Sequence, residues 1–198
     1  MDGMSMWELD PAHTTIEFAV KHMMFTTVRG RFTKFSGTVR VDERNPEGSD
    51  VDVDIDAASI DTGVADRDTH LRSADFLDVE NHPRITFRST GVKGAHAKAG
   101  DRFTVTGELD IRGQALPVTL EVTFTGVGKD PWGKQRGGFE ARAEIDRREW
   151  GLKWNQALEA GGVLVANNVK IEIEAQAVKQ SLEQEQAPAA TQSAAAKA

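Results

Sequence analysis

The chain has 198 residues, no cysteine and a formal net charge of −7 at neutral pH. This length suits a single domain that buries a sizeable core without covalent cross-links. The lack of cysteine excludes disulfides, a thiolate nucleophile and a Cys-ligated metal. The acidic balance argues against nucleic acid or an anionic bilayer surface as a partner, because both attract an excess of Lys and Arg.

Neither terminus carries an evident targeting or chemical signal. The first ten residues are acidic and lack the cationic and apolar regions of a secretory signal. We therefore expect a cytoplasmic protein, or a periplasmic one if the chain is a trimmed mature form. No run approaches the ~18 consecutive apolar residues that span a bilayer, so no stable membrane insertion is expected. We predict a flexible segment at 1–6, one domain over 7–180 and a disordered Ala/Gln-rich tail at 181–198.

Apolar and polar residues alternate with a period of two from Thr14 to Val178, which is typical of half-buried strands. The expected strands, in chain order, centre on residues 14–21, 28–41, 51–55, 85–87, 103–111, 116–124, 139–145 and 169–175. The apolar phase of the second run shifts between Gly30 and Gly37, which predicts a bulge or bend. Alternating aspartates at 50–56 predict an acidic face toward water.

Glycine residues mark two of the connections between these runs. Arg112-Gly113-Gln114 predicts a tight turn between the fifth and sixth strands. Gly126-Val-Gly128, followed by Lys129-Asp-Pro-Trp-Gly133, has the wrong spacing for a dinucleotide loop. We interpret it as a hairpin loop with Trp132 at its tip.

The single helical prediction covers Asp66 to Phe76, between the third and fourth strands, with Asp66 or Asp68 as its cap. A second short helix or an irregular segment is expected through Trp150 to Leu158.

Together these elements predict an all-β fold, an extended eight-stranded antiparallel barrel with one short helix. Runs of ten residues or more give strands of roughly 33 Å, so the barrel is tall. Eight strands enclose an interior that is filled by side chains or holds one small ligand, and the pattern leaves both open.

Catalytic and metal-binding patterns are weak. The histidines at 13, 22, 70, 82 and 96 show none of the i, i+4 spacing of helical metal ligands, so no metal site is predicted. No G-x-S-x-G or Ser-x-x-Lys motif is present to activate a serine. We predict no catalytic residue and no enzymatic activity.

Six segments read together resemble the YceI-like family, the polyisoprenoid-binding or lipid-binding YceI-like domain. They are WELDPAHTTIEFAVKH from Trp7, VRGRFTKFSG from Val28, SIDTGVADRDTHLRSADF from Ser59, HPRITFRS from His82, GELDIRG from Gly107 and DRREWG from Asp146. The resemblance covers about residues 7 to 178. Trp150 stands where the family pattern leads us to expect Phe.

The resemblance implies a lipocalin-like barrel, a homodimer, and a long apolar pore that binds a polyisoprenoid, an isoprenoid quinone or a similar amphiphile. No cofactor besides such a lipid is expected. Small inward residues, namely Gly107, Ala141 and Ala143, are expected to leave space in the pore. The predicted lining consists of Ile16, Phe18, Val20, His22, Phe32, Phe35, Leu71, Phe76, Ile85, Phe87, Leu109, Leu120, Phe139, Ile145 and Trp150.

Arg67, His70 and Asp75 are candidates for contacting a lipid head group at the pore mouth, or for fixing the helix to the barrel rim. The leading hypothesis is non-enzymatic binding, storage or transport of the lipid. The alternatives are an enzyme acting on an isoprenoid or quinone-type ligand inside the barrel, and a stress-associated structural domain with a filled core.

Overall fold

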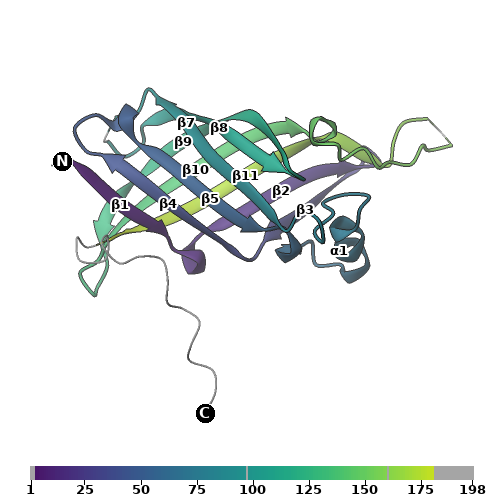
Figure 1. Cartoon of the computed structure of the whole chain (residues 1–198), viewed down its shortest axis with the longest axis horizontal. Helices are drawn as coiled ribbons and strands as arrows, with labels where there is room; N and C mark the ends of the chain where they lie inside the picture. Colours follow the sequence, from purple (N-terminus) through teal and green to yellow (C-terminus); the bar gives the residue numbers. More distant parts are fainter. Residues whose placement is uncertain (1–2, 97, 160, 181–198) are drawn as a thin grey trace, which may run out of the picture.

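The computed structural model describes residues 3–96, 98–159 and 161–180. Within them, eleven strands and one α-helix form an elongated molecule whose long axis follows the strands (Figure 1). The strands are β1 Met4–Leu9, β2 Thr15–His22, β3 Thr26–Phe32, β4 Phe35–Asp42, β5 Asp50–Asp56, β6 Ile60–Asp61, β7 Arg84–Lys93, β8 Arg102–Ile111, β9 Gln114–Lys129, β10 Gln135–Asp146 and β11 Val165–Lys179. The helix is α1, Ala65–Arg72.

These eleven segments occupy eight positions around a closed antiparallel barrel. β1 and β2 both pair with β11, one beyond the other along its length. In the next position, β4 pairs with β1 and β3 pairs with β2. In the position after that, β5 pairs with β4 and β6 pairs with β3. The remaining five strands each fill one position, and the pairing of β1 with β11 closes the ring. The predicted all-β, eight-stranded antiparallel barrel is confirmed.

The N-terminal strand begins earlier than predicted. Met4 to Met6 pair with Asp42 to Arg40 of β4, so this part of the segment 1–6 is a strand and not a flexible terminus. Trp7 is buried, and its indole Nε1 donates a hydrogen bond to Ser5 Oγ at 2.9 Å. Trp7 and Leu9 alone form too short an alternating pattern to predict a strand. The strand forms because its backbone pairs with β4. Residues 1–2 and the predicted tail at 181–198 lie outside the described residues.

The predicted interruption of the second run falls at Thr33 and Lys34, between β3 and β4. Ser59 holds this break, because its carbonyl accepts from Thr33 N and its Oγ accepts from Lys34 N. Gly30 lies directly beneath the ring of Phe18, where an added Cβ would be 2.3 Å from Cζ. The glycine thus allows the aromatic ring to cross its neighbouring strand.

Two turns show how local sequence sets the strand ends. Arg112 and Gly113 both have positive φ (56° and 73°), and they close the predicted tight turn between β8 and β9. The predicted hairpin loop between β9 and β10 contains Trp132 but starts later than Gly126, because Gly126 to Lys129 continue β9 and pair with β10. The connection lies at 130–134 instead, where Asp130 Oδ1 accepts from the backbone N–H groups of Trp132 and Lys134.

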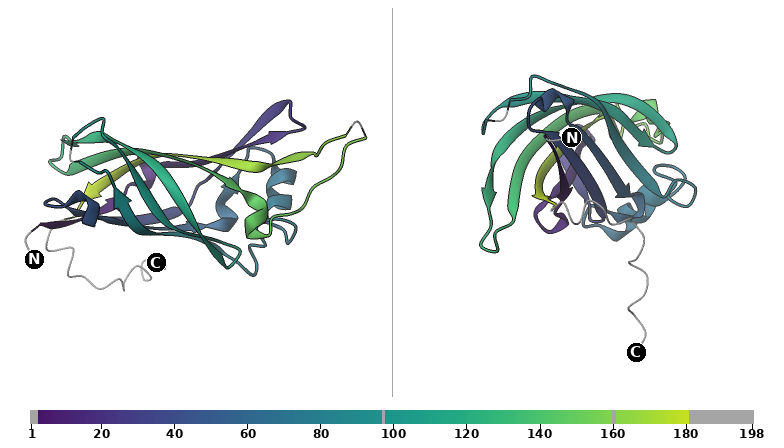
Figure 2. Two further views of the ribbon diagram at one scale, coloured as in Figure 1. Left: turned by 90° about the horizontal axis from the view of Figure 1, so that it is seen from above. Right: turned by 60° about the vertical axis from the view of Figure 1, so that its left-hand side comes forward.

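The predicted helix between the third and fourth barrel positions is present as α1, but it ends at Arg72 and not at Phe76. Neither Asp66 nor Asp68 caps it, since the N-cap position is Val64 and has no side-chain hydrogen bond. Asp68 is buried and accepts instead from the backbone N–H and the hydroxyl of Thr62. α1 lies at one end of the barrel, as seen in Figure 1 and in the left view of Figure 2.

The aspartates of β5 are not a bare solvated face. Arg88 Nη2 lies 2.8 Å from Asp54 Oδ2, and Arg40 Nη2 lies 2.9 Å from Asp52 Oδ2. These arginines come from β7 and β4, the strands on either side of β5. Opposite charges therefore face each other across neighbouring strands, which stabilises the pairing of β5 with β4 and β7.

Candidate functional site

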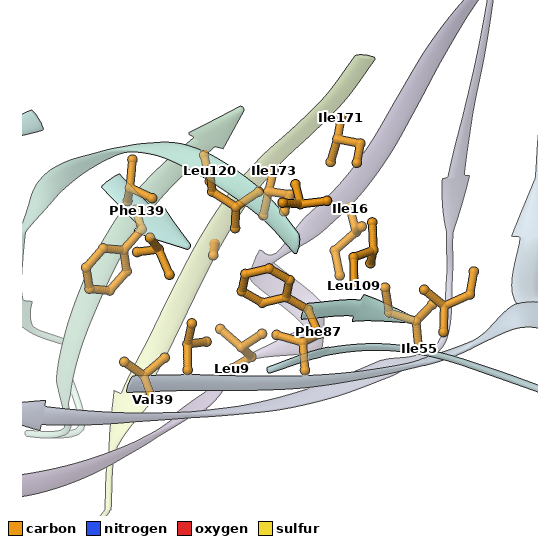
Figure 3. A pocket seen from close by; sticks show the side chains of 18 of the residues that line it. Leu9, Ile16, Val39, Ile55, Phe87, Leu109, Leu120, Phe139, Ile171 and Ile173 are labelled. Atoms are coloured by element: carbon orange, nitrogen blue, oxygen red, sulfur yellow. The ribbon is translucent and has the colours of Figure 1, made fainter. Parts of the chain in front are cut away.

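A cavity of about 640 Å³ runs through the barrel from the α1 end to the opposite end. Its wall is almost entirely hydrocarbon, and side chains from strands on all sides point into one shared space (Figure 3). Leu9, Ile55, Phe87, Leu120 and Ile173 show this convergence. The volume lies in the range of about 300–1,000 Å³ typical of small-molecule sites.

The wall is apolar because each strand turns alternate residues inward. On β2 these are Ile16, Phe18 and Val20, and on β11 they include Ile171 and Ile173. The register aligns them, since Ile16 faces Ile173 and Phe18 faces Ile171 across the pair. The same alternation that forms the sheet therefore produces the cavity surface.

The two ends of the cavity differ. At the α1 end, which we call the closed end, Phe76, Leu77 and Leu152 are buried and complete the wall. At the other end, the open end, the lining includes Val127, which is 59% exposed, and the exposed residues Glu43 and His96. The exposed lining residues therefore lie at the end away from α1.

Most of the predicted lining residues do line the cavity. Those that do are Ile16, Phe18, Val20, Phe32, Leu71, Phe76, Ile85, Phe87, Leu109, Leu120, Phe139 and Ile145. His22 pairs with Val165 and Thr26 near the tip of β2, outside the lining. Phe35 packs against the core without reaching the cavity.

Trp150 also lies behind the wall and not on it. It is only 2% exposed, and its indole Nε1 donates to the carbonyl oxygen of Leu109 at 2.9 Å. The residue ends a 3₁₀ turn, Arg147–Trp150, after which the chain to Leu158 contains no second helix. Trp150 thus supports β8 from the side of that turn.

The prediction that Gly107 leaves open space is wrong. A Cβ at this position would lie 2.5 Å from Phe87 Cζ and 2.5 Å from the Arg88 carbonyl oxygen. The Phe87 ring already occupies the space above the glycine. Ala141, by contrast, does line the cavity, whereas Ala143 packs against the core.

We expect Gly107→Ala to destabilise the fold by about 1–3 kcal/mol, because the methyl group must displace a backbone carbonyl and a packed ring. Urea unfolding of the variant measures this. Gly91→Ala is the matched control, since Gly91 lies in the neighbouring strand and an added Cβ would meet nothing within 4 Å. Equal stability of the two variants would contradict the close-approach role of Gly107.

The three head-group candidates lie outside the cavity lining. Arg67 uses its guanidinium on Thr62, with Nε donating to Oγ1 at 2.7 Å and Nη2 to the carbonyl at 2.9 Å. His70 Nε2 lies 2.9 Å from Asp75 Oδ2, and the imidazole packs edge-on against Phe76 and Trp154. These contacts hold α1 in place at the closed end, in keeping with the alternative role of fixing the helix to the barrel rim.

Arg147 is a buried charged lining residue that sequence reasoning missed. It is 4% exposed and lies at the closed end, where it donates to the backbone carbonyls of Ala166, Leu152, Trp154 and Val165. Burial lowers the pKa of its guanidinium from the usual range. Hydropathy gave no signal for it, because Arg147 and Arg148 look alike in sequence and only one of them is buried.

Arg148 is the exposed neighbour, and it pairs with Asp146 through Nε at 3.0 Å. This side-chain bond, with a second one from the Arg148 backbone N–H, lowers the pKa of Asp146 to about 2. A carboxyl whose pKa is depressed by folding stabilises the protein above its unfolded pKa and loses that contribution as the pH falls through the folded pKa.

We therefore expect the Asp146 contribution to stability to be complete above about pH 4 and to disappear toward pH 2. Denaturant unfolding of the wild type and Asp146→Asn across this range measures it. The variant should show a shallower loss of stability between these two values. Parallel pH profiles for the two proteins would contradict the assignment.

Metal ligands and membrane-spanning helices were also sought in the part of the chain that the structure describes, together with polar groups in the cavity lining. No group of three or more His, Cys, Asp or Glu side chains there could hold a metal ion. None of the described helices has the length and apolar character needed to cross a membrane. The polar lining residues are Glu17, Asp42, Glu43, Ser49, Asp50, His96 and Arg147.

Comparison with known proteins agrees with this architecture. The family model described as the YceI-like domain matches residues 7–177. The chain belongs to the YceI-like family. The match begins within β1 and ends within β11, so it covers nearly the whole barrel.

Individual proteins are also similar to this chain in sequence or in fold. Protein YceI of Escherichia coli O157:H7 is 43% identical over 141 residues, covering 71% of this chain and 72% of that protein. The crystal structure of Burkholderia cenocepacia BcnA superposes with a TM-score of 0.70 at 26% identity, covering 85% of this chain and 98% of BcnA. A domain from Saccharophagus degradans, described as polyisoprenoid-binding, has a TM-score of 0.65 at 14% identity and covers 88% of this chain and 98% of its own.

Proposed function

We propose that this barrel binds a polyisoprenoid or a similarly long amphiphile in its cavity and stores or transports it without chemical change. The observation that carries the proposal is the single, continuous, nearly all-hydrocarbon cavity that opens at one end. The description of the Saccharophagus degradans domain as polyisoprenoid-binding supports the same ligand class.

The energetics favour a long chain as the ligand. Each methylene or methyl group that leaves water for an apolar wall contributes roughly 0.8 kcal/mol before ordering costs. The wall offers few polar partners along its length, so affinity should follow the length of the buried chain more than its functional groups. A prenyl chain is also branched and flexible enough to follow a lining of Ile, Val and Phe side chains.

The two alternative functions have less support. A structural domain with a filled core would pack its interior to crystal-like density, whereas this barrel encloses a cavity of about 640 Å³. An enzyme would need a nucleophile and base, or a metal, beside the ligand. The described lining is apolar in the middle of the cavity. Its polar residues are Glu17, which alternates with the inward residues of β2, and residues at the two ends.

The test is to extract purified native protein with organic solvent, to identify any released amphiphile by mass spectrometry, and to titrate the emptied protein with prenols of increasing length. We expect a co-purified amphiphile, or an affinity that rises with each isoprene unit. Absence of both would overturn the proposal. Conversion of the bound lipid without an added partner would favour the enzyme.

The homodimer stays a prediction, and so does the cytoplasmic location. Sedimentation equilibrium on the lipid-bound and emptied protein measures the first. Fractionation of cells that express the native gene measures the second.

A further inference from the structure

Arg147 is a buried cation with no carboxylate partner among the described residues. All four of its acceptors are neutral backbone carbonyls, and it forms none of the salt bridges found in the described chain. Its neighbour Asp146 is bound to Arg148 instead. Asp146 thus acts on Arg147 only through space. Burying a charge without a hydrogen-bonded counter-charge is costly, so its position at an apolar cavity calls for an explanation.

The guanidinium also has donor capacity left over. Arginine has five N–H groups, and the four acceptors of Arg147 account for four of them. The contact from Nη2 to the Val165 carbonyl is long, at 3.5 Å, which makes Nη2 the most weakly satisfied nitrogen. Since Arg147 lines the cavity, an acceptor oxygen at the closed end could take this donor.

Charge at the open end has the opposite sign. The lining there includes Asp42, Glu43 and Asp50. Glu43 is bound by Lys179 and Asp50 by Arg40, but these cations lie outside the lining. An acceptor oxygen therefore meets carboxylates, which have no donor to offer, at the opening, whereas Arg147 offers it a donor at the closed end.

We propose that Arg147 is a head-group subsite: the ligand lies with an acceptor oxygen, from a carboxylate or a quinone-type carbonyl, against Arg147 and with its hydrocarbon chain directed toward the open end. This proposal rests on the lipid-binding function and adds to it the direction in which the lipid lies in the cavity. It also assigns the head group to the closed end and not to Arg67, His70 and Asp75.

Arg147 has a structural role as well, because its four carbonyl contacts tie residues 152–166 to the end of β10. Loss of that tie would weaken binding of every ligand to a similar extent. A subsite has a different signature, since it changes the preference between ligands that share one chain and differ only in the head. The experiment must therefore measure a ratio of affinities.

The test compares a long-chain fatty acid with the hydrocarbon of the same chain length, by titration of the emptied protein and its variants. We expect Arg147→Gln to lower the acid-to-hydrocarbon affinity ratio at least tenfold, and Arg147→Lys to keep most of it because the charge remains. Arg148→Gln is the matched control, since it removes the same charge from the outer surface and should leave the ratio unchanged. An unchanged ratio in Arg147→Gln, or an equal fall in Arg148→Gln, would overturn the subsite.

A second measurement uses proteins that keep Arg147, so it holds even if Arg147→Gln fails to fold. Trp7 lines the half of the cavity toward the open end, Trp132 lies on the exposed loop there, and Trp150 and Trp154 lie at the closed end. A fatty acid brominated beside its carboxyl quenches only indoles near its head. We expect quenching to persist in Trp7→Phe/Trp132→Phe, and its loss in that variant would place the head at the opening and overturn the proposal.

These outcomes separate the two proposals. If neither the acid nor the hydrocarbon binds, the lipid-binding function itself fails. If both bind with a ratio that is independent of Arg147, the function stands and the head-group subsite fails.

Discussion

Replacing Ala141 by phenylalanine should abolish binding of long-chain lipids while leaving the barrel folded. Ala141 lines the middle of the cavity and faces Val122 and Ile173 across the sheet. A ring at this position occupies the path of the chain and displaces several methylenes. Loss of four such groups, at roughly 0.8 kcal/mol each, corresponds to an affinity loss of more than about 100-fold. Titration with a long prenol measures the effect.

The fold should tolerate this change because the added ring enters a cavity and not a packed core. Overpacking a filled core costs about 1–3 kcal/mol, and we expect less than that here. Arg142→Phe is the control, since Arg142 is exposed on the outer face of the same strand. A prenol affinity of Ala141→Phe equal to that of wild type would show that the ligand does not lie in the barrel.

Trp150→Ala should destabilise the fold by about 3–5 kcal/mol, more than the substitution of Gly107 or Trp132. The indole is 2% exposed, and removing it leaves both a void and an unpaired carbonyl at Leu109. Trp150→Phe keeps most of the volume and loses the hydrogen bond, so a smaller cost of about 1–3 kcal/mol is expected. Urea unfolding measures both.

Trp132→Ala provides the comparison for Trp150. Trp132 is 82% exposed at the tip of the β9–β10 loop, so its removal should change the free energy of unfolding by less than about 0.5 kcal/mol. If Trp150→Ala were no more harmful than Trp132→Ala, the supporting contact between the 3₁₀ turn and β8 would be unimportant for stability.

Strand number and inward faces follow from the sequence because both rest on a local period. Ile16, Phe18 and Val20 are two residues apart, and any strand places such residues on one side. The helix between the third and fourth barrel positions is predictable for the same local reason. Its length is not, since α1 stops at Arg72 where the chain turns to bring Phe76 and Leu77 onto the closed end.

Contacts between distant segments explain the failures. Met4 to Met6 become a strand only because β4 is present to pair with them. Gly107 looks like free space in the sequence, but the ring of Phe87 on the adjacent strand fills it. Asp68 has the residue type and position of a helix cap, yet Thr62 takes its carboxylate.

The sequence by itself determined an antiparallel barrel with apolar residues facing inward, because alternation is a property of each strand alone. Only the tertiary structure decided that the interior is a cavity with one open and one closed end, since the closure of the ring and the position of α1 depend on pairing between distant strands. It also decided which of two adjacent arginines is buried. Arg147 points inward because it donates to the carbonyls of Leu152, Trp154, Val165 and Ala166. Arg148 stays outside with Asp146.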